Sequence, residues 1–417
     1  MNFGRFSHYL KQNFRFFARL ERIRDSRVAG RTKIPGKVAL GALFLQAFLR
    51  ERSPSHMQDV YLRKKSVVKL LWGKKRRPDG VPLAVSHDAL SDYLPKLNLN
   101  DLKLLQRDAA VALSRRGALT FPGTNLVAAS IDGIARVVPD PDSDGALRIK
   151  QVMVKRDGTR IEIERGEYML VHAQVVGTLI PTQLTVTMAK TSEYAAAIEV
   201  LTETKRRYGH GFVGLWLFDA LYPTAEVFNT AISCGGDVVV KVKKGSLFED
   251  ALRLIERVPY RRVEFTDCRG DRKHYRVREV EGYFSEWADV GTPLRFFEYV
   301  PDGGERQFCL TTLEFKRVPL EQLVKFPVSH WGIENNGHRD WRSFWNWDHL
   351  PSRTLAGITA WWHIIGLAAT LFYSYLRRRL PPMIRSKFPT IIAAVKSLII
   401  DFMFRFRADR LPVWAEV

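Results

Sequence analysis

The stretch NLVAASIDGIARVV, residues 125–138, marks the point at which the character of the chain changes. Before it, up to about residue 118, apolar residues recur every three or four positions, as in KVALGALFLQAFLRE (37–51), and this spacing predicts helices. The stretch itself is a continuous apolar run with several β-branched residues, typical of a buried strand, and the run reaches Asp132. A β-containing region therefore follows a helical one.

Strand and helix patterns alternate after this point. LRIKQVMVKRDG (147–158) and YMLVHAQVVGTLIPTQLTV (168–186) predict strands, with turns expected at Asp157–Gly158 and at Gly166. A helix is predicted over 192–209, followed by a strand, a turn, a short helix and a further strand over 212–245. Strands that lead into helix, strand, helix, strand predict a mixed α/β fold.

Residues 245 to about 315 are again β-like but more polar, as in HYRVREVEGYF, and the chain from about 320 onward is helical. This order predicts a β-rich segment inserted into the α/β unit. The sequence divides into a helical, basic domain (1–118), an α/β core (119–244 and 320–376), a β-rich insertion (245–319) and a C-terminal helical segment (377–417).

Positive charge is concentrated at one end of the chain. The formal net charge is +21 and the pI is near 10, and residues 1–120 hold 25 Lys/Arg against 9 Asp/Glu, an excess of 16. Such a balance favours a polyanionic partner, either DNA, RNA or an acidic membrane face. The runs at 62–77 and 103–116 are candidate binding surfaces, including Lys74, Lys75, Arg76 and Arg77; the alternative is a solvated basic face.

Cysteine use and the N-terminal residues indicate a cytoplasmic protein. The three cysteines, Cys234, Cys268 and Cys309, are widely spaced, which argues against a disulfide framework or a zinc site and favours a reducing compartment. Residues 1–20 interleave Arg and Lys with Phe and lack the apolar run and cleavage site of a signal peptide.

One segment raises the question of a membrane. Residues 355–380 are apolar for about the length that spans a bilayer and end in Arg377, Arg378 and Arg379. His363, Ser374, two Thr and two Gly dilute the run, so a buried core helix with a basic C-terminal end is the preferred interpretation over a membrane span.

Two aspartates follow hydrophobic strands. Asp132 ends LVAASID and Asp219 ends VGLWLFD. Ligands gather at strand ends in α/β sheets, where a carboxylate has a rigid base and an open front. For either residue alone, an Asp that starts a turn is an equally good interpretation.

A third carboxylate lies in an unusual setting. HWGIENNGHRDWRSFWNWDH (330–349) holds Glu334 among four Trp and three His. If 328–346 is a helix, its aromatic residues, Trp345 among them, share the face of Glu334 and pack on the sheet. Two aspartates and one glutamate would supply three oxygen ligands for Mg²⁺, or for Mn²⁺, and two such ions could support in-line displacement at phosphorus.

The order Asp, Asp, Glu in SIDG, LFDALYPTAEVF and HWGIENNGHRD resembles the DDE transposases of bacterial insertion sequences, and most of all the insertion-sequence-four superfamily. SHDALSDYL also resembles a stretch that precedes the catalytic core in that superfamily. The resemblance, over roughly 80–350, implies an RNase H-like core with a β-strand insertion between the second Asp and the Glu. It implies Asp132, Asp219 and Glu334 as catalytic and metal ligands, two Mg²⁺ ions, and cleavage and strand transfer of DNA by a homodimer.

The sequence departs from the superfamily around the Glu. Many members carry a Tyr and an Arg before it and a Lys seven residues after it, where this chain has Pro327, His330 and Trp341. His330, His338, Arg339 and Arg342 are therefore candidates for contacts with the DNA backbone. Lys241, Lys243 and Lys244, which follow a core strand close after Asp219, are placed to meet phosphate as well, and a solvated strand end is the alternative for them. Trp287 in the insertion is a candidate for stacking on a flipped base, with a core role as the alternative.

Two other functions are consistent with the sequence. A catalytically silent DNA-binding protein derived from a transposase would not need all three carboxylates. A membrane-anchored basic protein would use the apolar segment as its span. The leading hypothesis is a transposase with endonuclease and strand-transfer activity.

Overall fold

The computed structural model describes residues 3–27, 32–51, 53–72, 84–154, 158–243, 249–266, 272–283, 290, 292–332, 345, 347, 351–378, 397–398 and 401–402. Contacts divide the chain into two compact units, and each unit combines segments that are distant in the sequence. The first consists of Met1–Ala112, Arg136–Glu167 and Arg339–Val417, and the second of Leu113–Ala135 and Tyr168–His338. The four domains drawn from the sequence have different boundaries and remain a prediction.

Helices make up most of the first unit, as the apolar spacing predicted. They are α1 (Phe3–Phe14), α2 (Phe16–Leu20), α3 (Gly36–Leu49), α4 (Pro54–Met57), the π-helical η1 (Gln58–Leu62), α5 (Lys65–Trp72), α6 (His87–Tyr93), the 3-10 turn η2 (Leu94–Lys96), α7 (Leu99–Ser114) and α14 (Leu355–Arg378). The last two residues of α7 belong to the second unit.

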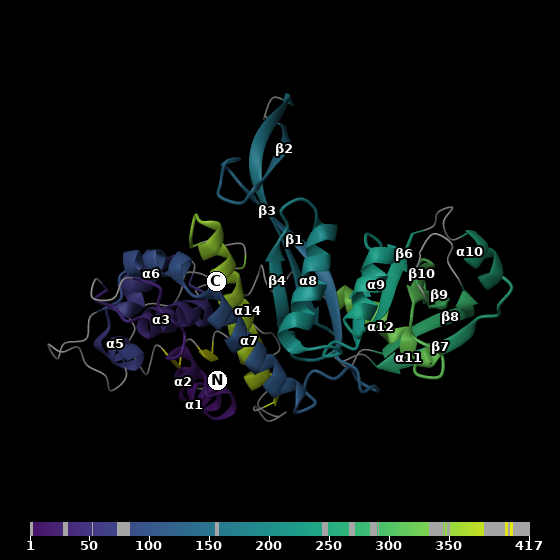
Figure 1. Ribbon diagram of the computed structural model, residues 1–417, viewed down its shortest axis with the longest axis horizontal. Coiled ribbons are helices and arrows are strands. Elements are labelled where there is room, and N and C mark those ends of the chain that lie inside the picture. Colours follow the sequence, from purple (N-terminus) through teal and green to yellow (C-terminus); the bar gives the residue numbers. More distant parts are fainter. Residues whose placement is uncertain are drawn as a thin grey trace. The chain divides into compact units, whose positions relative to one another are not determined.

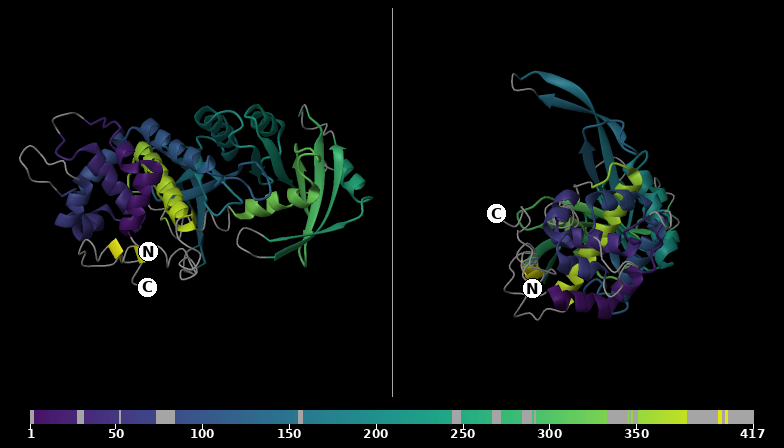
Figure 2. Two further views of the ribbon diagram at one scale, coloured as in Figure 1. Left: turned by 90° about the horizontal axis from the view of Figure 1, so that it is seen from below. Right: turned by 90° about the vertical axis from the view of Figure 1, so that its left-hand side faces the viewer.

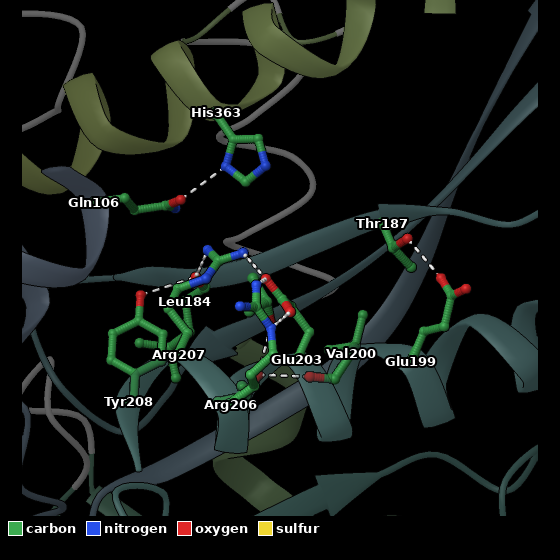
Figure 3. Close-up of polar contacts among 12 residues, drawn as sticks. Gln106, Leu184, Thr187, Glu199, Val200, Glu203, Arg206, Arg207, Tyr208 and His363 are labelled. Atoms are coloured by element: carbon green, nitrogen blue, oxygen red, sulfur yellow. Dashed lines mark hydrogen bonds and ion pairs between the residues drawn. The ribbon is translucent and has the colours of Figure 1, made fainter. Parts of the chain in front are cut away.

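Helix α14 is the buried centre of the first unit and packs on α3, α1 and η2 (Figures 1 and 2). The ring of Phe6 lies against those of Phe372 and Tyr375 of α14, and His363 Nδ1 donates to Gln106 Oε1 at 2.8 Å (Figure 3). Within the part of the chain described, α14 is the one helix long and apolar enough to cross a membrane, with a mean hydropathy of 1.5. Because 83% of that apolar window is buried inside the protein, the helix serves as core in this structure.

Within the described residues, one mixed sheet holds ten strands. The strands are β1 (Ala128–Val138), β2 (Leu147–Val154), β3 (Arg160–Val175), β4 (Gln183–Met188), β5 (Leu215–Phe218), β6 (Asp237–Val242), β7 (Arg261–Thr266), β8 (Arg272–Tyr283), β9 (Leu294–Pro301) and β10 (Gln307–Thr311). Their order is β2-β3-β1-β5-β6-β10-β9-β8-β7, and β4 also pairs with β3. The segment β4-β3-β1-β5-β6, in which β1, β5 and β6 are parallel, is the RNase H-like core that the resemblance implied.

The strands between β6 and α11 extend the core sheet. β10 pairs antiparallel with β6, and β9, β8 and β7 follow it in order, with α10 (Glu249–Ile255) packed on β8 and β9 (Figure 1). The inserted strands are therefore continuous with the core, whereas the sequence had suggested a sheet of their own.

Helices cover both faces of the sheet in the second unit (Figure 2). On one face lie α8 (Glu193–Tyr208) and α9 (Ala225–Ser233), and on the other lie α11 (Leu320–Leu323) and α12 (Lys325–Gly332). Arg207 Nη1 and the Tyr208 hydroxyl both donate to the carbonyl oxygen of Leu184, which fixes the end of α8 to β4 (Figure 3). The sheet face under α11 and α12 is apolar, and its residues Leu217 and Val239 belong to the same core cluster as Phe326 of α12.

The break expected at Gly166 is wrong, because β3 runs through it without interruption. A Cβ at this position would lie 2.5 Å from the carbonyl oxygen of Asp140, closer than two such atoms can approach. Gly166 thus allows the loop before β2 to cross close to the strand, and the glycine marks a close approach of backbone rather than a turn.

Candidate active site

The pairing of three parallel strands sets Asp132, Asp219 and Lys241 in one row. Ser130 of β1 lies opposite Leu217 of β5, and Phe218 of β5 lies opposite Val240 of β6. If the same alignment continues past the last paired residues, Asp132 lies opposite Asp219, and Asp219 lies opposite Lys241 on its other side. Aligned residues of parallel strands point to the same face, and adjacent strands lie about 4.8 Å apart. The two predicted aspartates are therefore neighbours on the face that α12 covers.

Exposure and charge differ along this row. The Asp219 side chain is 41% exposed and that of Lys241 is 10% exposed, with Lys241 Nζ 3.9 Å from Asp219 Oδ1. Asp132 is half-buried, and its Oδ1 accepts from the backbone N–H of Gly133 at 2.9 Å. Both carboxylates thus remain accessible from solvent, while the buried ammonium group offsets part of their repulsion.

Asp132 does not end its strand, contrary to the sequence interpretation. β1 continues to Val138 and has β3 as its other neighbour. The pairing of β1 with β5, however, ends near Asp132, because Ser130 and Leu217 are the last paired residues of the two strands. The open front expected at a strand end therefore arises because β5 stops, at Phe218, while β1 goes on.

A buried hydrogen-bond chain joins α12 to the row of the aspartates. Ser130 Oγ donates to the carbonyl oxygen of Leu217 at 3.2 Å and also hydrogen-bonds to Nδ1 of His330. Because the hydroxyl has one proton, the hydrogen in the second bond belongs to His330 Nδ1. His330 is 1% exposed and lies four residues before Glu334, so the chain enters the Glu motif from a fixed point beside β1.

On the opposite face, two tyrosine–glutamate hydrogen bonds join the first turn of α8 to the segment that leads into α9 and to the first turn of α9. Tyr222 OH donates to Glu193 Oε1 at 2.5 Å, and Tyr194 OH donates to Glu226 Oε2 at 2.6 Å. Burial raises the pKa of Tyr222, and the charges of Glu193, Asp132 and Asp219 raise it further. The sequence interpretation missed Tyr222 and Glu193. A tyrosine three residues after Asp219 and an acidic residue in the first turn of a helix were the available signals.

The other predicted site residues have varied outcomes. Lys243 is exposed at the end of β6, and Lys241 and His330 are buried as described above. Trp345 does not pack on the sheet as expected, since its ring lies against Phe372 of α14 at 5.7 Å. Several predicted residues lie outside the described part of the chain: Glu334, His338, Arg339, Arg342, Lys244, Lys74, Lys75, Arg76, Arg77 and Trp287.

The donors at this site fit a hard divalent cation. Asp132 and Asp219 offer carboxylate oxygens side by side, on a rigid sheet and open to solvent, and oxygen is the donor that Mg²⁺ prefers. Among the residues described, no group of three His, Cys, Asp or Glu side chains is close enough to hold a metal ion. A site for such an ion therefore needs a further ligand, and Glu334 is the candidate.

Comparisons with known proteins identify the family of this chain. A family model described as "Transposase DDE domain" matches residues 157–371, just over half of the chain, including Asp219 and Glu334 but not Asp132. No curated protein matches the chain. A chain in the cryo-EM structure of the piggyBac transposase synaptic complex with hairpin DNA is similar at a TM-score of 0.39 and 11% identity, covering 98% of this chain and 81% of that one. The chain belongs to the family of transposases with a DDE domain.

Proposed function

We propose that this protein cuts DNA at the ends of a mobile element and joins those ends to target DNA, using Asp132, Asp219 and Glu334 to hold two Mg²⁺ ions. The observation that carries the proposal is the register of β1 and β5, which sets two accessible aspartates side by side in a chain of the transposase family. When bound, paired Mg²⁺ ions activate an attacking oxygen and stabilise the leaving oxygen of a phosphodiester.

The anchoring of His330 supports the assignment of Glu334 as the third ligand. His330 is bonded to Ser130, which is two residues before Asp132 and on the same face of β1. Glu334 lies four positions after His330, and a chain of that length spans at most about 13 Å. This closeness in sequence to the anchored His330 supports Glu334 as the third ligand.

The remaining roles follow from charge. Lys241 lies beside Asp219, and Lys243 and the basic first third of the chain contact phosphate groups. The protein acts on DNA in the cytoplasm, at the nucleoid, as a homodimer that pairs the two element ends.

The test is strand cleavage of a duplex that carries the ends of the encoding element. Wild-type protein should nick it with Mg²⁺ and not with EDTA. Asp219→Asn should lower the rate by more than the ~10–100-fold typical of removing a group that only supports a ligand, while its affinity for the duplex stays unchanged. Binding without cleavage by the wild type would leave the DNA-binding alternative and reject the catalytic one.

A further inference from the structure

We propose that Tyr222 and Glu193 form a positioning pair that fixes the Asp219 carboxylate for metal binding. This inference rests on the function proposed above. It concerns two residues on the far side of the sheet from α12: Glu193 at the start of α8 and Tyr222 in the turn after β5.

Tyr222 fixes the turn after β5 at three points. Its backbone N–H donates to the carbonyl oxygen of Asp219 at 3.2 Å, which closes the turn. Its ring lies 5.5 Å from that of Phe218, the last residue of β5. Tyr222 as a whole is only 1% exposed, and its hydroxyl donates to Glu193. Asp219 is therefore held on its N-terminal side by the sheet and on its C-terminal side by Tyr222.

Glu193 brings a third negative charge to the edge of the aspartate pair. A Cβ at Gly133, the residue after Asp132, would lie 2.6 Å from Glu193 Cδ, so the carboxyl group lies directly against β1 at this point. Tyr222 is close enough to Glu193, Asp132 and Asp219 to interact electrostatically with all three.

A neighbouring contact provides a matched control. Tyr194 OH donates to Glu226 and also hydrogen-bonds to Thr224 Oγ1 at 2.9 Å, so it too links α8 to the start of α9. Burial and Glu226 raise the pKa of Tyr194, and neither aspartate contributes to that shift. Tyr194→Phe thus removes a similar hydroxyl between the same two helices without acting on the turn at Asp219.

The experiment measures Mn²⁺ binding to the DNA-free protein by the loss of the free-ion EPR signal, beside the Mg²⁺ dependence of cleavage. Tyr222→Phe keeps the ring and the turn and removes only the hydroxyl, whereas Glu193→Gln removes only the charge. Both should weaken Mn²⁺ binding, and raise the Mg²⁺ concentration for half-maximal cleavage, by ~10-fold or more, the range for groups that orient a ligand. Tyr194→Phe should stay within about twofold of wild type on the same scale.

Thermal unfolding of each variant separates positioning from folding. If Tyr222→Phe unfolds at the assay temperature, Glu193→Gln carries the test alone, since it leaves the ring and the turn in place. Mn²⁺ binding by both variants equal to that of Tyr194→Phe would overturn the positioning role. If the wild type bound Mn²⁺ but never cleaved DNA, the proposed function would fail, and the order of Mn²⁺ affinities would still decide whether Tyr222 positions Asp219.

Discussion

Asp219, which follows β5, and Glu298, in the middle of β9, lie on the same sheet, but the first carboxylate is open to solvent and the second is fully buried. Asp219 is 41% exposed and has a lysine 3.9 Å away. Glu298 is 0% exposed and accepts from Tyr260 OH at 2.7 Å, from Arg278 Nε at 2.8 Å, and from Arg306 Nε and Nη2 at 2.6 and 3.0 Å. A carboxylate whose acceptor sites are filled holds the fold together, and one left open to solvent is available to a ligand.

The largest expected effect is on stability in the insertion. Glu298→Gln leaves the buried Arg278 without its charge partner, whereas Arg306 keeps Glu256, and breaking a buried ion pair from one side costs about 3–5 kcal/mol. Urea unfolding would measure this loss. Asp219→Asn and the exposed control Glu264→Gln should change the unfolding free energy by less than about 0.5 kcal/mol. A large loss for Asp219→Asn would show that the comparison is wrong.

A smaller loss of stability is expected at Ser130, which both holds the fold together and lies beside the two aspartates of the proposed site. Ser130→Ala removes the group that links His330 to the carbonyl oxygen of Leu217, and leaving a buried donor without a partner costs about 1–3 kcal/mol. Cleavage should fall as well, because α12 loses its fixed point beside Asp132. Measuring unfolding and cleavage on the same variant would sharpen the comparison. If Ser130→Ala were destabilised but still cleaved DNA at the full rate, the hydrogen bond between Ser130 and His330 would not be needed for catalysis.

The smallest expected effect concerns pH. Burial acts to raise the pKa of Glu298, but hydrogen bonds from Arg306, Tyr260 and Arg278 outweigh it and hold the pKa below the ordinary value of 4.5. A carboxyl group with a lowered pKa stabilises the folded state above its unfolded pKa, and this stabilisation is lost as the pH falls through the folded pKa. The stability difference between wild type and Glu298→Gln should therefore be largest at neutral pH and shrink below pH 4.5. A difference that stayed constant in acid would show that charge is not its cause.

The sequence predicted the parts of the site that depend on local patterns. Apolar runs that reach Asp132 and Asp219 identify buried strands, and the parallel ladder then places the two aspartates together. Glu334 came from a resemblance carried by its motif, and its position lies outside the described residues.

Residues that act through tertiary contacts could not be predicted in this way. In the sequence, Ser130 is indistinguishable from the other residues of its strand, and its hydrogen bond to His330 joins residues 200 apart in sequence. Lys241 read as a surface phosphate contact because its run is basic, but the central position of β6 buries it. Strand order depends on pairing between distant segments, so the insertion could not be recognised as an extension of the core sheet.

The pairing of β6 with β10 also has a consequence for how the chain folds while it is being synthesised. β6 ends at Val242 and β10 begins at Gln307, so the partner of β6 is synthesised about 65 residues later. At roughly 5–20 residues per second, the edge of β6 waits about 3–13 s on the ribosome before its partner exists. DVVVKV is a largely apolar strand of the kind that pairs readily with other chains, and its only charged residues are Asp237 at its start and Lys241 near its end. We therefore expect nascent chains stalled within the insertion to aggregate through β6, and chains that have passed β10 to remain soluble.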